Sequence, residues 1–217
     1  MNKKIRWGIL GAGRIAQKFA SDLTFVKDAE LFAIASRGKA NAELFSGLYP
    51  AALQYNSYEA LVQNPDVDVI YIATPHALHH EHDLLCIEHG KAVLCEKAFA
   101  LNTRQAKEMI AAAKTQQVFL MEALWSKFIP SWQKMMEMIR DGQLGEIKNV
   151  LINFGFIPQA PVADRLYNPA LGGGTLLDIG VYNVFYALSA LGKPDHIEAR
   201  MTAAATGVDE QCAVLLR

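Results

Sequence analysis

Short apolar runs alternate with amphipathic segments along the chain as far as residue 122. The runs predict strands at Ile5–Leu10, Leu31–Ser36, Val69–Ala73, Ala92–Cys95 and Val118–Glu122. The segments between them have helical spacing and predict helices at Arg14–Asp22, Ala40–Leu48, Tyr58–Gln63, Ala77–His89 and Thr103–Gln116. Strands that alternate with helices favour a doubly wound parallel sheet with crossover helices. The pattern therefore predicts an α/β domain over residues 1–122.

After residue 122 the alternation lapses, and the pattern predicts a second domain over residues 123–217. Its expected elements are a helix at Pro130–Asp141, a strand at Ile147–Phe156, an irregular loop with prolines, a helix opening at Gly172–Gly174, and strands near His196–Ala205 and Gln211–Leu216. This mixture is typical of an α+β domain with an open, mainly antiparallel sheet. No further segment follows the last predicted strand to pair with it, and an exposed strand edge promotes aggregation. We therefore expect a truncated chain, or an edge that another subunit completes.

Composition narrows the class of partner. The chain has 217 residues, 52% of them hydrophobic, and can bury a substantial core, while its net charge of −1 gives no field that steers polyanions. Nucleic acids and membranes are therefore not expected partners, and the substrate is expected to be small. Cys86, Cys95 and Cys212 lie far apart in apolar stretches and are interpreted as reduced, buried thiols. The N-terminal segment leads into a strand without a hydrophobic signal core, so we expect a cytoplasmic protein.

A glycine-rich turn joins the first predicted strand to the first predicted helix. Gly11, Gly13 and Ala16 have the spacing with which a chain approaches the pyrophosphate of a dinucleotide. Arg14 and Ile15 begin the helix, whose free N–H groups would point at the anion. Tight turns also use glycine for steric reasons alone. Because a strand precedes the motif and a helix follows it, we expect Gly11, Gly13, Arg14 and Ile15 to contact a dinucleotide cofactor.

The end of the second predicted strand indicates which dinucleotide is bound. An acidic residue at this place accepts a hydrogen bond from the ribose 2′-hydroxyl of NAD. This chain has Ser36 and Arg37 there instead, a hydroxyl and a guanidinium that suit a 2′-phosphate. The alternative is that Arg37 is a solvated loop cation. The sequence favours NADP over NAD as the cofactor.

The ends of two further predicted strands carry residues that could take part in catalysis or in cofactor binding. Glu96 and Lys97 follow the strand Ala92–Cys95, at the carboxyl edge where open α/β sheets bind ligands. Most lysines are surface cations, but one at this edge of a dinucleotide-binding domain is a candidate for proton transfer.

Another cluster follows the strand Val69–Ala73. Thr74, Pro75 and His76 form a turn whose backbone groups can meet the cofactor ribose, and His79 is expected to line the cofactor cleft. The nearby histidines could also form a metal site. Because they lie within about one helical turn with no second acid-rich segment, no metal is predicted.

In the second domain, Asp178 and Tyr182 are four residues apart and share one face if the segment is helical. Both are polar positions within a largely apolar segment. A phenol near an ammonium group can give or take the proton that accompanies hydride transfer. The alternative is that Tyr182 is a core residue with a satisfied hydroxyl, and that Gly172–Gly174 mark only a tight helix entry.

Together these motifs resemble the Gfo/Idh/MocA oxidoreductase family, from the first strand to the last residue. Glu96–Lys97, Met121–Pro130 and Gly172–Tyr182 look most like the branch that contains dimeric trans-dihydrodiol dehydrogenase, NADP-dependent xylose dehydrogenase and glucose–fructose oxidoreductase. The resemblance implies an N-terminal Rossmann domain and a C-terminal open sheet used for homodimer contacts. It also implies a cleft between them for a sugar, polyol or diol. Family chains are longer than this one, which again points to truncation.

The resemblance also implies roles for single residues. The lysine–tyrosine pair of the branch falls on Lys97 and Tyr182, with Asp178 orienting them, in hydride transfer between NADP(H) and a CH–OH carbon. Walls of the substrate cleft fall on Trp125, Phe128 and Arg165. The usual Glu-Lys-Pro of the family is Glu-Lys-Ala here, and the histidine of many members is Tyr182. The alternative function is a non-catalytic NADP-binding sensor or regulator on the same fold.

Overall fold

The computed structural model describes residues 3–51, 53–159 and 164–217. The chain divides into two compact units, Met1–Ala123 and Leu124–Arg217. Each unit has its own sheet.

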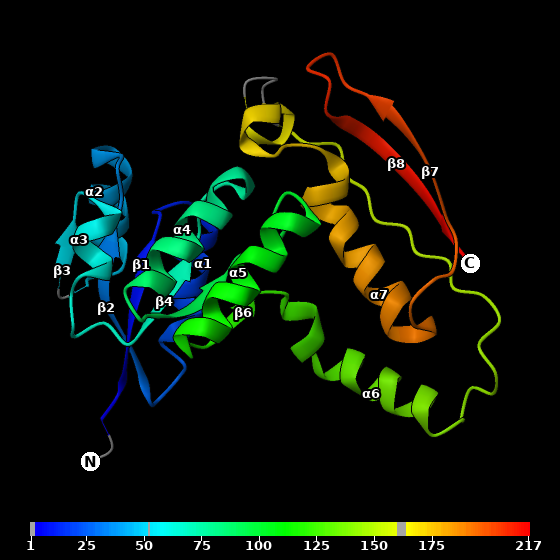
Figure 1. Ribbon diagram of the computed structural model, residues 1–217, viewed down its shortest axis with the longest axis horizontal. Helices are drawn as coiled ribbons and strands as arrows, with labels where there is room; N and C mark the ends of the chain where they lie inside the picture. The colour runs from blue at the N-terminus through cyan, green and yellow to red at the C-terminus, as the bar shows by residue number, and fades with distance from the viewer. Residues whose placement is uncertain (1–2, 52, 160–163) are drawn as a thin grey trace. The chain divides into compact units, whose positions relative to one another are not determined.

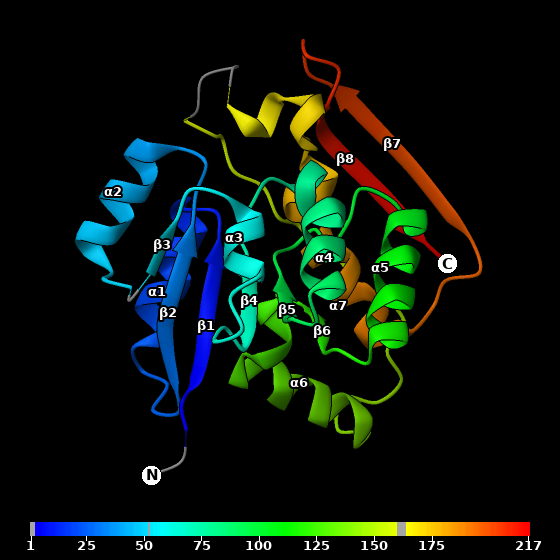
Figure 2. The same ribbon diagram turned by 60° about the vertical axis from the view of Figure 1, so that its left-hand side comes forward.

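The first unit is built on a six-stranded parallel sheet in the order β3-β2-β1-β4-β5-β6 (Figures 1 and 2). Its strands are β1 Ile5–Leu10, β2 Ala29–Ala35, β3 Leu53–Tyr55, β4 Val69–Ile72, β5 Ala92–Cys95 and β6 Leu120–Glu122. The predicted parallel sheet is confirmed, and β3 is an addition that the sequence pattern does not show. The strand order reverses between β1 and β4, which is where doubly wound sheets open a crevice for a ligand.

Helices cover both faces of this sheet. They are α1 Arg14–Leu23, α2 Lys39–Leu48, α3 Tyr58–Val62, the 3₁₀ turn η1 His76–Leu78, α4 His79–Glu88 and α5 Thr103–Gln116. The side chain of Ser57 accepts a hydrogen bond from the Ala60 N–H, and that of Asn102 from the Gln105 N–H, so polar caps fix the starts of α3 and α5.

The core lies in two layers because successive residues of a strand point to opposite faces. Ile9 joins a cluster with residues of α1 and α2, including Phe45. The next residue, Leu10, joins a cluster with residues of α3, α4 and α5, including Leu61 and Met109. Figure 2 shows α4 and α5 lying together over the β4–β5 side of the sheet. This packing fixes the strand ends that carry the candidate site.

One carboxyl group is buried inside the second of these layers. Asp83 on α4 has no exposed surface, and no nitrogen or oxygen donor among the described residues reaches its carboxyl oxygens. Burial raises the pKa of Asp83 to about 7, with only the neighbouring Cys95 thiol acting against the rise. The thiols of Cys86 and Cys95 are buried as well, and burial raises the pKa of both.

Replacing Asp83 with asparagine is expected to remove a pH dependence of stability. The folded carboxyl holds its proton up to about pH 7, whereas the unfolded chain releases it near pH 3.8. Its contribution to the unfolding free energy is therefore fully present below pH 3.8 and is lost as the pH rises to about 7, by about 1.4 kcal/mol per pH unit at most. Because asparagine does not titrate, the variant should gain stability relative to the wild type as the pH rises from about 4 to about 7. Urea unfolding measures this difference, and a difference that stays constant with pH would contradict it.

The second unit contains helices and an antiparallel hairpin. Its elements are η2 Trp125–Phe128, α6 Pro130–Arg140, η3 Arg165–Tyr167, η4 Pro169–Leu171, the π-helical turn η5 Leu176–Gly180, α7 Val181–Leu191, β7 Ile197–Ala203 and β8 Asp209–Leu216. The rings of α6 and α7 pack together, with the Trp132 centroid 4.6 Å from that of Tyr186 and 5.5 Å from that of Phe185. Strands β7 and β8 pair from Ile197 and Leu216 to Ala203 and Asp209, with a register shift between Thr202 and Ala203.

The predicted strand at Ile147–Phe156 is wrong. Residues 147–159 have no regular secondary structure, and within the described residues β7 and β8 pair only with each other. An apolar run becomes a strand only where a hydrogen-bonded neighbour is present. Residues 160–163 of the predicted proline-containing loop lie outside the described residues.

Close backbone contacts fasten the start of the η5–α7 segment. A Cβ atom at Gly173 would meet the carbonyl oxygens of Leu166 and Arg165 at 2.6 and 2.7 Å, so the turn needs glycine. The Asp209 carboxylate accepts the Leu176 N–H at 2.6 Å, which joins the start of β8 to the helical segment. The glycine run is therefore a close-packed turn before the helix and not its first turn.

One apolar stretch, Pro169–Leu191, is long and apolar enough to cross a membrane by length and composition, with 23 residues and a mean hydropathy of 1.3. It is divided among η4, η5 and α7, and its middle carries the buried carboxylate of Asp178. Arg165, outside the stretch, pairs with that carboxylate. Ionisable groups are rare in membrane spans, so we interpret the stretch as part of the α+β unit.

Candidate active site

The glycine turn after β1 forms a cradle that fits a pyrophosphate. Gly11 has φ +101°, and its N–H donates to the Ala35 carbonyl at 2.9 Å. A Cβ atom there would meet the Ala73 carbonyl oxygen at 3.0 Å, so only glycine lets the turn lie this close to the end of β4. Helix α1 begins at Arg14, and no side chain caps it at Gly13. Its first N–H groups are therefore available to an anion.

Arg37 lies at the end of β2, where the sequence predicts the 2′-phosphate contact. Its guanidinium carbon is 5.3 Å from the ring centroid of Tyr58, the first residue of α3, and this contact orients an otherwise exposed cation. The backbone N–H of Gly38 donates to the Ser36 hydroxyl at 3.3 Å, which shapes the loop. Tyr58 was not among the predicted site residues, because only the fold brings it beneath Arg37.

Lys97 lies in a turn at the carboxyl edge of the sheet, residues 97–99, which we call the Lys97 turn. The Glu96 carboxylate accepts the Lys97 N–H at 3.2 Å and also a hydrogen bond from the Tyr71 hydroxyl. The Glu122 carboxylate, at the end of β6, accepts the Phe99 N–H at 3.0 Å. Burial raises the pKa of both glutamates, and the charge of Lys97 opposes the rise. The turn therefore lies between two partly buried carboxyl groups.

Glu122 and Tyr71 were missed in the sequence analysis. For Glu122 a signal existed, since it is the last residue of a parallel strand and must lie at the same edge as Glu96. For Tyr71 no signal existed, because a tyrosine inside an apolar strand has the pattern of a core residue.

Histidine side chains of α4 contact the loop of residues 74–75, which we call the Thr74 loop. The two ring nitrogens of His79 lie 2.8 Å from the Thr74 and Ala98 carbonyl oxygens, and His79 has no exposed surface. The His82 Nδ1 lies 3.0 Å from the Thr74 hydroxyl. His76 is buried as well, whereas Pro75 is half-buried. Among the described residues, no three histidine, cysteine or acidic side chains converge as metal ligands would.

In the second unit, Asp178 and Arg165 form an ion pair. Both terminal nitrogens of Arg165 lie 3.2 Å from one carboxylate oxygen of Asp178, which is buried within the π-helical turn η5. Tyr182 lies one turn further, in α7, and its ring centroid is 5.8 Å from that of Phe154. π-Helical turns occur often at functional sites.

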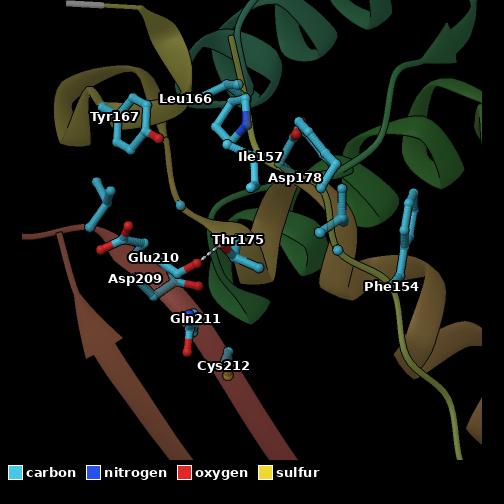
Figure 3. Close-up of a pocket in the computed structure, with 16 residues that line it drawn as sticks. Phe154, Ile157, Leu166, Tyr167, Thr175, Asp178, Asp209, Glu210, Gln211 and Cys212 are labelled. Atoms are coloured by element: carbon cyan, nitrogen blue, oxygen red, sulfur yellow. Dashed lines mark hydrogen bonds between the residues drawn. The ribbon is translucent and has the colours of Figure 1, made fainter. Parts of the chain in front are cut away.

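A pocket of about 600 Å³ opens beside this ion pair (Figure 3). Aromatic rings of Phe154, Phe156 and Tyr167 and the acidic side chains of Asp178, Asp209 and Glu210 contribute to its lining. Aromatic walls with a few polar groups are typical of small-molecule sites. The acidic groups can accept hydrogen bonds from hydroxyl groups of a ligand.

The remaining predicted residues lie on exposed surfaces of their units. Trp125 and Phe128 belong to η2, and the side chain of each is about half exposed. Lys97 belongs to the first unit and Tyr182 to the second, and their convergence beside one cofactor stays a prediction.

Two family models match the chain. One, described as the oxidoreductase family with an NAD-binding Rossmann fold, matches residues 5–124. The other, the GFO/IDH/MocA C-terminal domain, matches residues 132–217. Together they cover the sheets of both units.

The chain is similar to characterised enzymes over nearly its whole length. Trans-1,2-dihydrobenzene-1,2-diol dehydrogenase of Mus musculus is 40% identical, over 98% of this chain and 65% of the mouse protein. Its namesake from Xenopus laevis is 37% identical, over 97% of this chain and 64% of its own length. The solved structure of KijD10, a 3-ketoreductase from Actinomadura kijaniata, in complex with NADP and TDP-benzene has a TM-score of 0.87 at 30% identity, over 99% of this chain and 66% of that one. The chain therefore spans just under two thirds of the length of these relatives.

Proposed function

Because the chain belongs to the Gfo/Idh/MocA oxidoreductase family, we propose that it is an NADP-dependent oxidoreductase acting on CH–OH groups. The proposed reaction is hydride transfer between NADP(H) and a hydroxyl or carbonyl carbon of a sugar, a polyol or a trans-diol. The observation that carries the proposal is the Lys97 turn, which the partly buried side chains of Glu96 and Glu122 hold at the carboxyl edge of the sheet. The dehydrogenase names of the relatives and the NADP complex of the ketoreductase support it.

The first unit supplies the residues that would hold the cofactor. The backbone at Gly11 and Gly13 would approach the pyrophosphate, with Arg14 and Ile15 at the start of α1 beside it. Arg37 and Ser36 would bind the 2′-phosphate, and the Thr74 loop, with Pro75 and His76, would meet the ribose. When bound, the cofactor supplies the hydride-transfer chemistry.

Proton transfer would fall to side chains from both units. The Tyr182 hydroxyl would give a proton to the reacting oxygen of the substrate in the reductive direction, and the phenolate form of Tyr182 would take a proton from it in the oxidative direction. The ammonium group of Lys97 would donate a hydrogen bond to the same oxygen and stabilise the phenolate form of Tyr182. Asp178, fixed by Arg165 at 3.2 Å, would orient these groups. The exposed rings of Trp125 and Phe128 would close the substrate cleft and exclude water.

The test is a substrate panel followed at the nicotinamide absorbance band. Aldoses, polyols and trans-diols are each offered with NADP and with NAD, and the corresponding carbonyl compounds with NADPH and NADH. The expected result is turnover of at least one class, faster with the phosphorylated cofactor. Tight NADPH binding without turnover of any class would instead indicate a sensor or regulator.

The proposal extends to assembly and location. A homodimer formed through the C-terminal sheet would cover β7, whose residues are all exposed in the single chain. Analytical ultracentrifugation tests it, and a monomer at micromolar concentration would contradict it. The three free cysteines accord with a reducing cytoplasm, and cell fractionation tests that location.

A further inference from the structure

We propose that His79 is a positioning residue that ties the Lys97 turn to the Thr74 loop and so fixes the place of Lys97 relative to the cofactor. The inference rests on the proposed function for its catalytic consequence. Its structural basis lies wholly within the first unit.

His79 is placed to join two loops at once. It is the first residue of α4, and its ring lies between the ends of β4 and β5, with no surface exposed to solvent. Its Nδ1 is 2.8 Å from the Ala98 carbonyl oxygen, and its Nε2 is 2.8 Å from the Thr74 carbonyl oxygen. The sequence predicts that this ring lines the cofactor cleft. With both nitrogens occupied by backbone and no exposed surface, the ring acts through the two loops instead.

The Lys97 turn is held at each of its three residues. The N–H of Lys97 is bound by Glu96, the carbonyl of Ala98 faces His79, and the N–H of Phe99 is bound by Glu122. The two glutamates come from the same edge of the sheet as the turn itself. Of these three side chains, His79 is the one that also contacts the Thr74 loop, so it sets the distance between the two loops.

The protonation of the ring makes its two contacts unequal. Burial lowers the pKa of His79 to about 4, and electrostatic interactions with His76 and Lys97 act in the same direction, while the two carbonyl groups act against the shift. At neutral pH the ring therefore carries one proton and donates a hydrogen bond to only one of the two carbonyl groups, while its other nitrogen contacts the second. The two contacts can be kept or removed separately by amide side chains, whose nitrogen reaches one loop or the other.

Asparagine and glutamine at position 79 separate the two roles. An asparagine amide nitrogen occupies the place of Nδ1 and can still donate to Ala98, whereas a glutamine amide nitrogen occupies the place of Nε2 and can still donate to Thr74. We expect His79→Asn to keep kcat within about threefold of the wild type and to weaken NADPH binding. We expect His79→Gln to keep the NADPH affinity and to lower kcat by about 10- to 100-fold, because small displacements of a reacting group are costly. His79→Phe, which has no ring nitrogen, should lose both.

The matched control is the next residue of the same helix. His80 points toward Glu108 of α5, with 2.8 Å between the ring nitrogen and the carboxylate, and has no described contact with either loop. His80→Asn and His80→Gln should therefore leave kcat and NADPH affinity unchanged. Equal effects of asparagine and glutamine at position 79 on both quantities would overturn the proposal, as would wild-type constants in the phenylalanine variant. If that variant does not fold, the comparison of asparagine with glutamine decides.

Nuclear magnetic resonance of ¹⁵N-histidine-labelled protein tests the same contacts without catalysis. The ring of His79, assigned with the glutamine variant, should keep one neutral tautomer between about pH 5.5 and pH 8, with a ring N–H that exchanges slowly. A ring that titrates near the ordinary histidine pKa would overturn the inference. If the wild-type protein turns over no substrate, the proposed function fails, while these resonances and the NADPH dissociation constants still report on His79.

Discussion

Replacing Lys97 with methionine is expected to lower kcat by about 10²- to 10⁴-fold, the range for loss of a group that assists proton transfer. Methionine has a similar length and fills similar space, but it cannot donate a hydrogen bond to the reacting oxygen. The backbone of the turn is held by Glu96, His79 and Glu122, so the variant should fold and bind NADPH. The measurement is kcat with the best substrate of the panel, together with the dissociation constant of NADPH.

Lys107→Met on the exposed side of α5 is the matched control and should keep the wild-type kcat. A folded Lys97→Met protein with kcat within tenfold of the wild type would show that Lys97 is a surface cation.

Replacing Arg37 with aspartate is expected to reverse the cofactor preference. The change removes charge-assisted hydrogen bonds to the 2′-phosphate, each worth about 1.5–3 kcal/mol, and sets a carboxylate against that phosphate. NADPH affinity should fall by about 100-fold or more, since each 1.4 kcal/mol is a factor of about ten. NADH affinity should hold or rise, because a carboxylate accepts the 2′-hydroxyl. Fluorescence titrations with both reduced cofactors measure the change.

The control for this variant is Arg104→Asp, which makes the same charge change at an exposed position of α5. It separates the local contact from the general loss of positive charge. Unchanged NADPH affinity in Arg37→Asp would mean that the loop after β2 lies elsewhere than at the 2′-phosphate.

The first unit was largely predictable because its signals are local. The apolar run of β1 and the glycines after it act within a few residues, and the structure confirms the strand and the turn that they predict. The short strand β3 has no such signal and exists because β2 offers it an edge. The apolar stretch 147–156 shows the reverse case, with the pattern of a strand but no partner among the described residues.

The candidate site was predictable only where the chain order already places residues at strand ends. Gly11, Thr74 and Lys97 all follow parallel strands, and topology alone brings those ends to one edge. Contacts between distant segments leave no periodic pattern in the sequence. The packing of Arg37 over Tyr58 and the contact between His79 and Ala98 are therefore seen only in the structure.

The distribution of the thiols makes the native protein a ready substrate for site-specific labelling. Cys86 and Cys95 are sealed within the core of the first unit, whereas Cys212 on β8 is partly exposed and borders the pocket of the second unit. A maleimide dye has one accessible attachment point among the three cysteines of the chain. A dye at Cys212 would lie at the edge of that pocket without any engineered cysteine.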